Sequence, residues 1–323
     1  MIQRRTLLSA AGLSALSGLG QAQDKYPSRL ITWICPYAAG GGADARSRQV
    51  AKLMQAILGQ TIIVDNKAGG GGNVGTDLIS KARPDGYTIG MGNFAPLAVN
   101  HALFKKLNFD PFNDLVPIML IERGPLVLMV RNESPFKSVK DVVAAAKAKP
   151  GTLTYASGGI GGTHHLSGAL FEHTAGIDMI HVPYKGTGPA VQDTLGGHID
   201  VVFTGVGEVV PHVTSGDLRA LAVMSETRIP ALANVPTTAE AGYPGFIAGS
   251  WMGMLGPANL PRDVATWLSD KIVAAAQLDE FRLKAAGFGM APALLKGPET
   301  GAFMRALSER SREAITKANI TAD

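Results

Sequence analysis

The sequence is short of cysteine, aromatic residues and charge. A single cysteine, Cys35, in 323 residues excludes an intrachain disulfide framework and a multi-cysteine metal site. Charged residues make up 17% and aromatic residues 6%, whereas hydrophobic residues reach 46%, which predicts folded cores rather than disorder. The formal net charge is only +4 and no Lys/Arg cluster occurs, so we expect no nucleic-acid partner.

The first 22 residues have the pattern of an export signal. Arg4 and Arg5 precede a short apolar stretch, and small residues ending at Ala22 mark a cleavage site. The stretch is too short and too rich in Gly and Ser for a membrane anchor, and no later segment is long and apolar enough to be one. The adjacent arginines favour the twin-arginine route, although general signal peptides also carry arginine pairs. We therefore expect an exported, soluble, periplasmic protein with a net charge of +2 once Arg4 and Arg5 are removed.

The rest of the chain alternates short β-type runs with helical patterns, which is typical of α/β layers with mostly parallel strands. Strands are expected at 30–35, 61–65, 87–91, 126–130, 153–156, 179–182, 199–204 and 218–224, and helices across 44–58, 74–83, 139–146, 264–275 and 299–317. The length is that of two domains of about 150 residues. No long linker divides the chain, which favours two lobes joined by two or more strands.

Two glycine-rich loops each lie between a predicted strand and a predicted helix. The first runs from Tyr37 to Gly42 and is followed by Asp44, and the second runs from Ser157 to Thr163. Glycines allow backbone N–H groups to converge, and a helix N-terminus adds a partial positive charge, so such a loop favours an anion. Each loop alone is equally compatible with a tight turn, but the shared pattern predicts one anionic group held between two lobes.

Motifs for enzymes and nucleotides are weak or missing. Residues 70–75 match G-x-G-x-x-G, but no acidic residue ends a second strand about 20 residues later, and no Lys-Ser/Thr pair follows the glycines. The sequence contains no G-x-S-x-G and no H-E-x-x-H. We therefore expect no catalytic residues and no cofactor.

The remaining candidates for site chemistry are histidines and a Tyr-Lys pair. His164 and His165 point about 100° apart on a helix, which is poor metal geometry, so we expect no metal and a loop-orienting role for His165. Tyr184 and Lys185 follow a predicted strand and place a phenol and a cation at the cleft. The alternative is an exposed lysine in a turn.

These motifs, in this order, resemble the Bug-type receptors, the periplasmic solute-binding proteins of tripartite tricarboxylate transporters. The matching segments are 36–41 with Asp44 and Arg48, 58–60, 64–69, 84–88, 181–186, 218–223, 235–237 and 240–242. The match covers essentially the whole chain after the signal.

The resemblance implies a type II-like, two-lobed periplasmic-binding-protein fold with the ligand cleft between the lobes. Lobe 1 would comprise residues 23–123 and 247–323, and lobe 2 residues 124–246, with the return crossing near 246–250. A ligand carboxylate would be held largely by backbone N–H groups and waters. The expected ligand-binding residues are Tyr37, Ala38, Ala39, Gly40, Gly41, Asp44, Ser157, Gly158, Gly159, Gly161, Thr163, His165, Tyr184, Lys185, Phe203 and Thr204.

The chain departs from the family pattern after the strand that ends at Phe203. Many relatives have Asp-Asn there, and that carboxylate can meet a ligand ammonium, whereas this chain has Thr204 and Gly205. Burying an unpaired ammonium costs several kcal/mol, so we expect carboxylates without an amine to bind better than amino acids. Tyr37 and Phe203 would favour a flat apolar body behind the carboxylate.

The sequence is thus interpreted as a non-enzymatic, monomeric receptor that binds a small organic carboxylate and delivers it to an integral-membrane transporter. Two alternatives stay open. The receptor could present its ligand to a signalling partner, or the α/β fold could be that of an enzyme.

Overall fold

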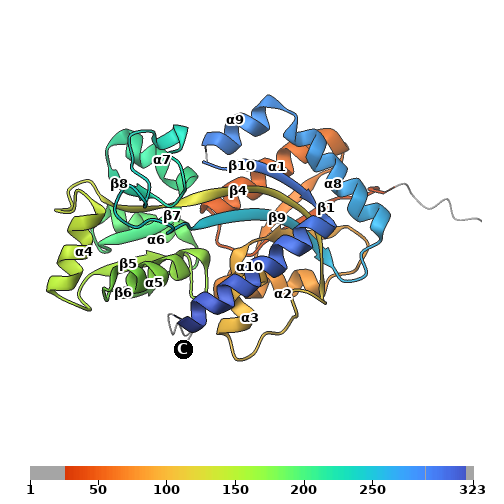
Figure 1. Cartoon of the computed structure of the whole chain (residues 1–323). Helices are drawn as coiled ribbons and strands as arrows, with labels where there is room; N and C mark the ends of the chain where they lie inside the picture. The colour runs from red at the N-terminus through yellow and green to blue at the C-terminus, as the bar shows by residue number, and fades with distance from the viewer. Residues whose placement is uncertain (1–25, 288, 318–323) are drawn as a thin grey trace, which may run out of the picture.

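Two α/β lobes share one curled sheet in the computed structural model, which describes residues 26–287 and 289–317 (Figure 1). The expected signal at 1–22 lies outside the described residues. The strand order is β2-β1-β3-β9-β4-β7-β5-β6, and β8 and β10 pair with β4 beside this path. The fold class predicted from the sequence is confirmed.

Lobe 1 contains both ends of the described chain. Its strands are β1 (Ile31–Cys35), β2 (Ile62–Asn66), β3 (Thr88–Gly92), β9 (Gly249–Pro257), β10 (Ala291–Lys296) and the first part of β4 (Leu115–Arg131). Its helices are α1 (Gly42–Leu58), α2 (Asn73–Ser80), α3 (Asn100–Leu103), α8 (Arg262–Ala276), α9 (Asp279–Gly287) and α10 (Gly297–Lys317), with short helical turns η1 (Gly70–Gly72) and η2 (Ala95–Val99).

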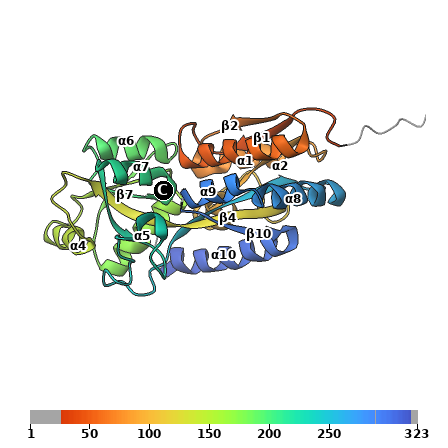
Figure 2. The same cartoon turned by 90° about the horizontal axis from the view of Figure 1, so that it is seen from above.

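Lobe 2 is formed by the middle of the chain and lies beside lobe 1 in both views (Figures 1 and 2). Its strands are β5 (Thr154–Ser157), β6 (Ile180–Pro183), β7 (Val201–Gly205), β8 (Leu218–Val223) and the end of β4. Its helices are α4 (Val139–Ala148), α5 (Thr163–Ala175), α6 (Thr187–Leu195) and α7 (Val206–Ser215), with the short turn η3 (Pro230–Leu232).

Local sequence explains the elements well. In α1, Val50, Leu53 and Met54 recur at helical spacing and are buried against Trp33 of β1. The helix ends at Gly59, whose φ of 66° lies in the left-handed region and lets its N–H reach back to the carbonyl of Gln55. Most predicted elements lie within two residues of the observed ones.

The two lobes are connected by long strands that run in opposite directions. The 17-residue strand β4 pairs with β9 from Leu115 to Pro125, and then pairs with β7 and β8 between Leu126 and Arg131. All four neighbours of β4 are antiparallel to it, so the prediction of mostly parallel strands is wrong. A chain that crosses between lobes and returns must place the two crossing strands antiparallel. The exact lobe boundaries, near 123 and 247, stay a prediction.

Each lobe has its own hydrophobic core. The core of lobe 1 joins β1, β3, β4 and β9 to α1, α8 and α9, and it includes the fully buried Cys35. The core of lobe 2 has two parts, of which one contains Phe203 with Tyr155 and Phe171. No helix among residues 26–287 and 289–317 has the length and apolarity of a membrane span.

Candidate functional site

The N-termini of four helices line one cavity between the lobes. The cavity has a volume of about 90 Å³. Helix α1 comes from lobe 1, and α5, α6 and α7 come from lobe 2; their N-caps are Gly41, Gly162, Gly186 and Gly205. None of the four N-cap glycines caps its helix with a side chain. The helices therefore present positive dipole ends and first-turn backbone N–H groups to an anion in the cavity, although the N–H of Gly42 already donates to Glu208.

The first glycine loop is held in place by Asp44. Its carboxylate accepts hydrogen bonds from the Gly40 N–H (3.0 Å) and from Asn66 Nδ2 (3.0 Å), and it pairs with Arg48 (2.9 Å). Burial opposes the ionisation of Asp44, but these hydrogen bonds outweigh it and lower its pKa. Asp44 is buried and does not line the cavity, so the structure gives it a loop-supporting position.

The second glycine loop is held by two stacked histidines. His165 Nδ1 accepts the N–H of Gly161 (3.0 Å), and its ring stacks on His181 with the centroids 3.9 Å apart. His181 Nε2 lies 2.6 Å from the hydroxyl of Ser157, which also accepts the N–H of Gly159 (3.2 Å). Burial lowers the pKa of His165 to about 4 and that of His181 to about 3, with a further contribution from His165 to the latter. Both imidazoles are therefore neutral at neutral pH.

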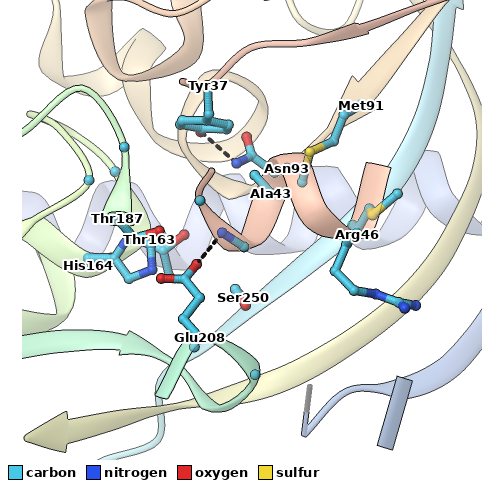
Figure 3. Close-up of a pocket in the computed structure, with 18 of the residues that line it drawn as sticks. Tyr37, Ala43, Arg46, Met91, Asn93, Thr163, His164, Thr187, Glu208 and Ser250 are labelled. Carbon is cyan, nitrogen blue, oxygen red and sulfur yellow. Dashed lines mark hydrogen bonds between the residues drawn. The ribbon is translucent and has the colours of Figure 1, made fainter. Parts of the chain in front are cut away.

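An acidic side chain faces the cavity one helical turn after Thr204. Glu208 Oε1 accepts the N–H of Gly42 across the cleft (3.0 Å), and Oε2 accepts the hydroxyl of Thr204 (2.6 Å). Figure 3 shows Glu208 pointing toward the N-terminus of α1. Burial raises the pKa of Glu208, and hydrogen bonds from Thr187, Thr204 and Gly42 oppose this. A carboxylate thus lies beside Thr204, where the sequence pattern shows no acidic residue, and the expected preference for ligands without an amine stays a prediction.

The wall of the cavity formed by lobe 1 is largely apolar. Met91, Met252, Met290, Trp251 and Ala43 line it. Beside them lies a buried ion pair, in which Arg46 Nε donates to Glu122 Oε1 (2.7 Å) and the two side chains are 5% and 0% exposed. Arg46 points to a different side from Glu208 (Figure 3). The guanidinium thus already has a carboxylate partner of its own.

Three polar side chains of lobe 1 add specific contacts. The Tyr37 hydroxyl accepts from Asn93 Nδ2 (2.5 Å) and donates to the carbonyl of Gly71 (3.5 Å). Among the described residues, Asn93 Oδ1 and Trp251 Nε1 are buried without a hydrogen-bond partner, although both residues line the cavity. A buried polar atom without a partner is costly, so a polar ligand group that meets these atoms would be stabilised.

The structure separates the residues expected from the sequence into two groups. Tyr37, Ala38, Gly41, Gly158 and Thr163 line the cavity. The others do not: Ala39, Gly40 and Lys185 are exposed, Asp44, Ser157, Gly159, Gly161 and His165 shape the loops, Tyr184 donates to Asp193, Phe203 lies in the core of lobe 2, and Thr204 donates to Glu208. Their expected roles in ligand binding stay predictions.

Sequence reasoning missed much of the cavity lining. Gly42 and Gly162 belong to the two predicted loops, and the additional residues are Ala43, Arg46, Met91, Asn93, Glu122, His164, Gly186, Thr187, Gly205, Gly207, Glu208, Ser250, Trp251, Met252 and Met290. Gly186 and Gly205 each follow a predicted strand and precede a helix, so the pattern used for the first two loops could have found them. The pair of Arg46 and Glu122 leaves no local signal, because 76 residues separate the partners.

No group of three metal-ligating side chains is close enough to hold an ion within the described part of the chain. His164 faces the cavity, but burial lowers its pKa to about 4, so it presents a neutral imidazole. A second hollow, between α8 and α10, is lined by residues of lobe 1 alone, and neither glycine loop contributes to its lining. The cavity between the lobes is therefore the candidate site.

Comparison with known proteins identifies the family. Residues 46–320 match the model of the tripartite tricarboxylate transporter family receptor. Protein BugT of Bordetella pertussis is 35% identical over 298 residues, which cover 92% of this chain and 90% of BugT.

Three solved structures are similar over nearly their whole length. The periplasmic binding protein BugD has a TM-score of 0.88 and 32% identity, with 92% of this chain and 99% of BugD covered. Rpa4515 of R. palustris with adipate has a TM-score of 0.89 and 30% identity, with 92% and 99% covered. MatC of Rhodopseudomonas palustris with bound malate has a TM-score of 0.86 and 28% identity, with 90% and 100% covered. The chain therefore belongs to the Bug-type receptors of the tripartite tricarboxylate transporter family, which are solute-binding proteins and not enzymes.

Proposed function

We propose that this protein is a periplasmic receptor that binds a small organic carboxylate between its lobes and delivers it to an integral-membrane transporter. One observation supports this most strongly: four helix N-termini line the same cavity, and Glu208 occupies one N–H, that of Gly42. Each N-terminus carries about half a positive charge, and a helix begins with several N–H groups that have no partner within the helix. The site can hold a carboxylate without any free cationic side chain.

The relatives support the same ligand class. Two structures of similar fold are described with adipate and with malate, both of them small carboxylates. A hydrogen bond from a donor to a charged group contributes about 1.5–3 kcal/mol, so several converging donors offset the cost of association and give micromolar affinity.

The amine preference of the ligand depends on Thr204 and Glu208. Thr204 offers an ammonium no carboxylate, whereas Glu208, which accepts the Thr204 hydroxyl, lines the cavity with one. The preference stays a prediction. Calorimetry that compares an amino acid with its deaminated analogue decides it.

The binding experiment is a thermal-shift screen followed by calorimetry with mono-, di- and tricarboxylates, including aromatic ones. A receptor of this kind shows a raised melting temperature with at least one carboxylate, a micromolar or lower Kd and no turnover of the ligand. Absence of binding to every carboxylate, or conversion of the ligand during the assay, would refute the proposal.

Export and assembly are part of the proposal. We expect processing after Ala22, export by the twin-arginine route, and a monomer in solution. Changing Arg4 and Arg5 to lysine should leave precursor in the cytoplasm, whereas unaffected maturation would indicate the general secretion route. Size-exclusion chromatography with light scattering measures the oligomeric state.

A further inference from the structure

Glu208 places a carboxyl group in a site whose other polar groups are mostly hydrogen-bond donors suited to an anion. It lies in the first turn of α7, and its carboxylate takes the N–H of Gly42 at the N-terminus of α1 (3.0 Å). This contact joins the two lobes, since Gly42 belongs to lobe 1 and Glu208 to lobe 2. One of the donors that a ligand carboxylate would use is therefore already occupied by the protein.

The charges around the cavity can be compared. Each of the four helix N-termini directs a partial positive charge, equivalent to about +0.5, toward the cavity. Arg46 and Glu122 lie within hydrogen-bond distance of each other, so this pair adds no net charge. His164 is neutral because burial lowers its pKa to about 4. The carboxylate of Glu208, which accepts hydrogen bonds from Gly42 and Thr204, opposes this positive potential at the place where a ligand carboxylate would bind.

We propose that Glu208 sets the charge of the ligand: the cavity accepts a carboxylate with a single negative charge and an uncharged remainder, and disfavours a dianion. The proposal rests on the proposed function as a carboxylate receptor. The uncharged remainder faces the largely apolar wall of Met91, Met252, Met290 and Trp251, where the unpartnered Trp251 Nε1 can meet an uncharged polar group of the ligand. A second carboxylate would meet either that apolar wall or Glu208, and both cost free energy.

The test uses a pair of probes that differ in charge and share a chain length. Hexanoate carries one carboxylate and adipate carries two on the same six-carbon chain. Calorimetry at neutral pH gives the ratio of the two dissociation constants for the wild type, for Glu208→Gln and for the control Glu226→Gln. Glu226 also belongs to lobe 2 but is exposed and does not line the cavity. Any effect on lobe closure is common to both probes and cancels in the ratio.

The wild type is expected to bind hexanoate more tightly than adipate. Glu208→Gln should shift the ratio toward adipate by at least tenfold, and Glu226→Gln should leave it within twofold. Glu208→Met, which is also neutral and of similar size, should shift the ratio in the same direction if the glutamine variant folds poorly. Succinate and butyrate form a second pair for a shorter site.

Two results would overturn the proposal while the receptor function stands. One is an unchanged ratio in both neutral variants that still bind carboxylates, which would show that Glu208 is uncharged in the site. The other is a wild type that prefers the dicarboxylates. If neither the four probes nor the wider carboxylate panel binds any of the proteins, the receptor function is refuted. The proposal that Glu208 sets the charge of the ligand then fails with it.

Discussion

The two walls of the cavity differ in what they offer a ligand. The wall of lobe 2 consists of glycines, hydroxyls and the first turns of α5, α6 and α7, with Glu208 among them. The wall of lobe 1 consists of three methionines, Trp251 and Tyr37, with one helix N-terminus and the ion pair of Arg46 and Glu122. Lobe 2 is therefore suited to an anionic group, and lobe 1 to the body that carries it. The cavity thus offers an anion backbone N–H groups of helix first turns, whereas the buried guanidinium of Arg46 already pairs with Glu122.

The largest expected effect concerns the buried ion pair of lobe 1. Removing one partner of such a pair leaves an uncompensated buried charge and costs about 3–5 kcal/mol. We expect Arg46→Met to lower the free energy of unfolding by this amount in urea denaturation followed by circular dichroism. The control is Lys296→Met, since Lys296 and Asp270 form an exposed pair (2.7 Å) whose loss costs under about 1 kcal/mol. Equal decreases in the free energy of unfolding for the two variants would show that the buried pair of Arg46 and Glu122 stabilises lobe 1 no more than an exposed pair does.

The second prediction concerns the protonation of His165, which holds the second glycine loop in the wall of lobe 2. His165 must be neutral to accept the N–H of Gly161, and burial lowers its pKa to about 4, whereas the unfolded chain has a pKa of about 6.5. Between pH 6.5 and pH 4 the unfolded state therefore binds a proton that the folded state excludes, and stability falls as the pH falls. The lowered pKa of His165 corresponds to a decrease of about 3 kcal/mol in the free energy of unfolding across this pH range. Chemical denaturation at a series of pH values measures the decline.

A matched variant isolates this contribution. His165→Asn keeps an acceptor for Gly161 and does not titrate, so its stability should decline less over the same pH range. The remaining decline belongs to other groups, including His181, whose pKa is lowered to about 3. An identical pH profile in the variant and the wild type would contradict the assignment.

The third and smallest effect concerns the contact between the two lobes. A Cβ on Gly71 of lobe 1 would lie 2.3 Å from the carbonyl oxygen of Ile160 in lobe 2, so Gly71→Ala opposes this contact between the lobes. We expect it to weaken carboxylate binding by about tenfold, or about 1.4 kcal/mol. Gly59→Ala is a matched control, because Gly59 has a similar φ (66° against 62°) but nothing within 4 Å of its Cβ. Similar affinities in the two variants would indicate that backbone strain matters and closure does not.

Both glycine loops could be predicted from the sequence because strand, glycines and helix follow one another within a few residues. Local patterns of apolar residues likewise predict the helices α1, α8 and α10. The strands β9 and β10 and the first half of β4 were missed, since Gly and Pro interrupt their apolar patterns and their pairing partners are distant in sequence.

The site itself was only partly predictable. Asp44, Ser157 and His165 were correctly placed at the loops, but whether a polar side chain turns into a cavity or back onto its own loop depends on tertiary contacts. Glu208, in contrast, is a residue that lines the cavity although the sequence does not single it out. It looks like an ordinary acidic residue in the first turn of a helix, and only the packing of lobe 1 against lobe 2 brings it to Gly42.

A crystal structure with a bound carboxylate tests whether helix N-termini hold the ligand. We expect the ligand carboxylate to lie within about 3.2 Å of backbone nitrogens at the N-termini of at least two of α1, α5, α6 and α7. The rest of the ligand should lie against Met91, Met252 and Trp251. A carboxylate held instead by the guanidinium of Arg46, with Glu122 displaced and no contact to a helix N-terminus, would contradict it.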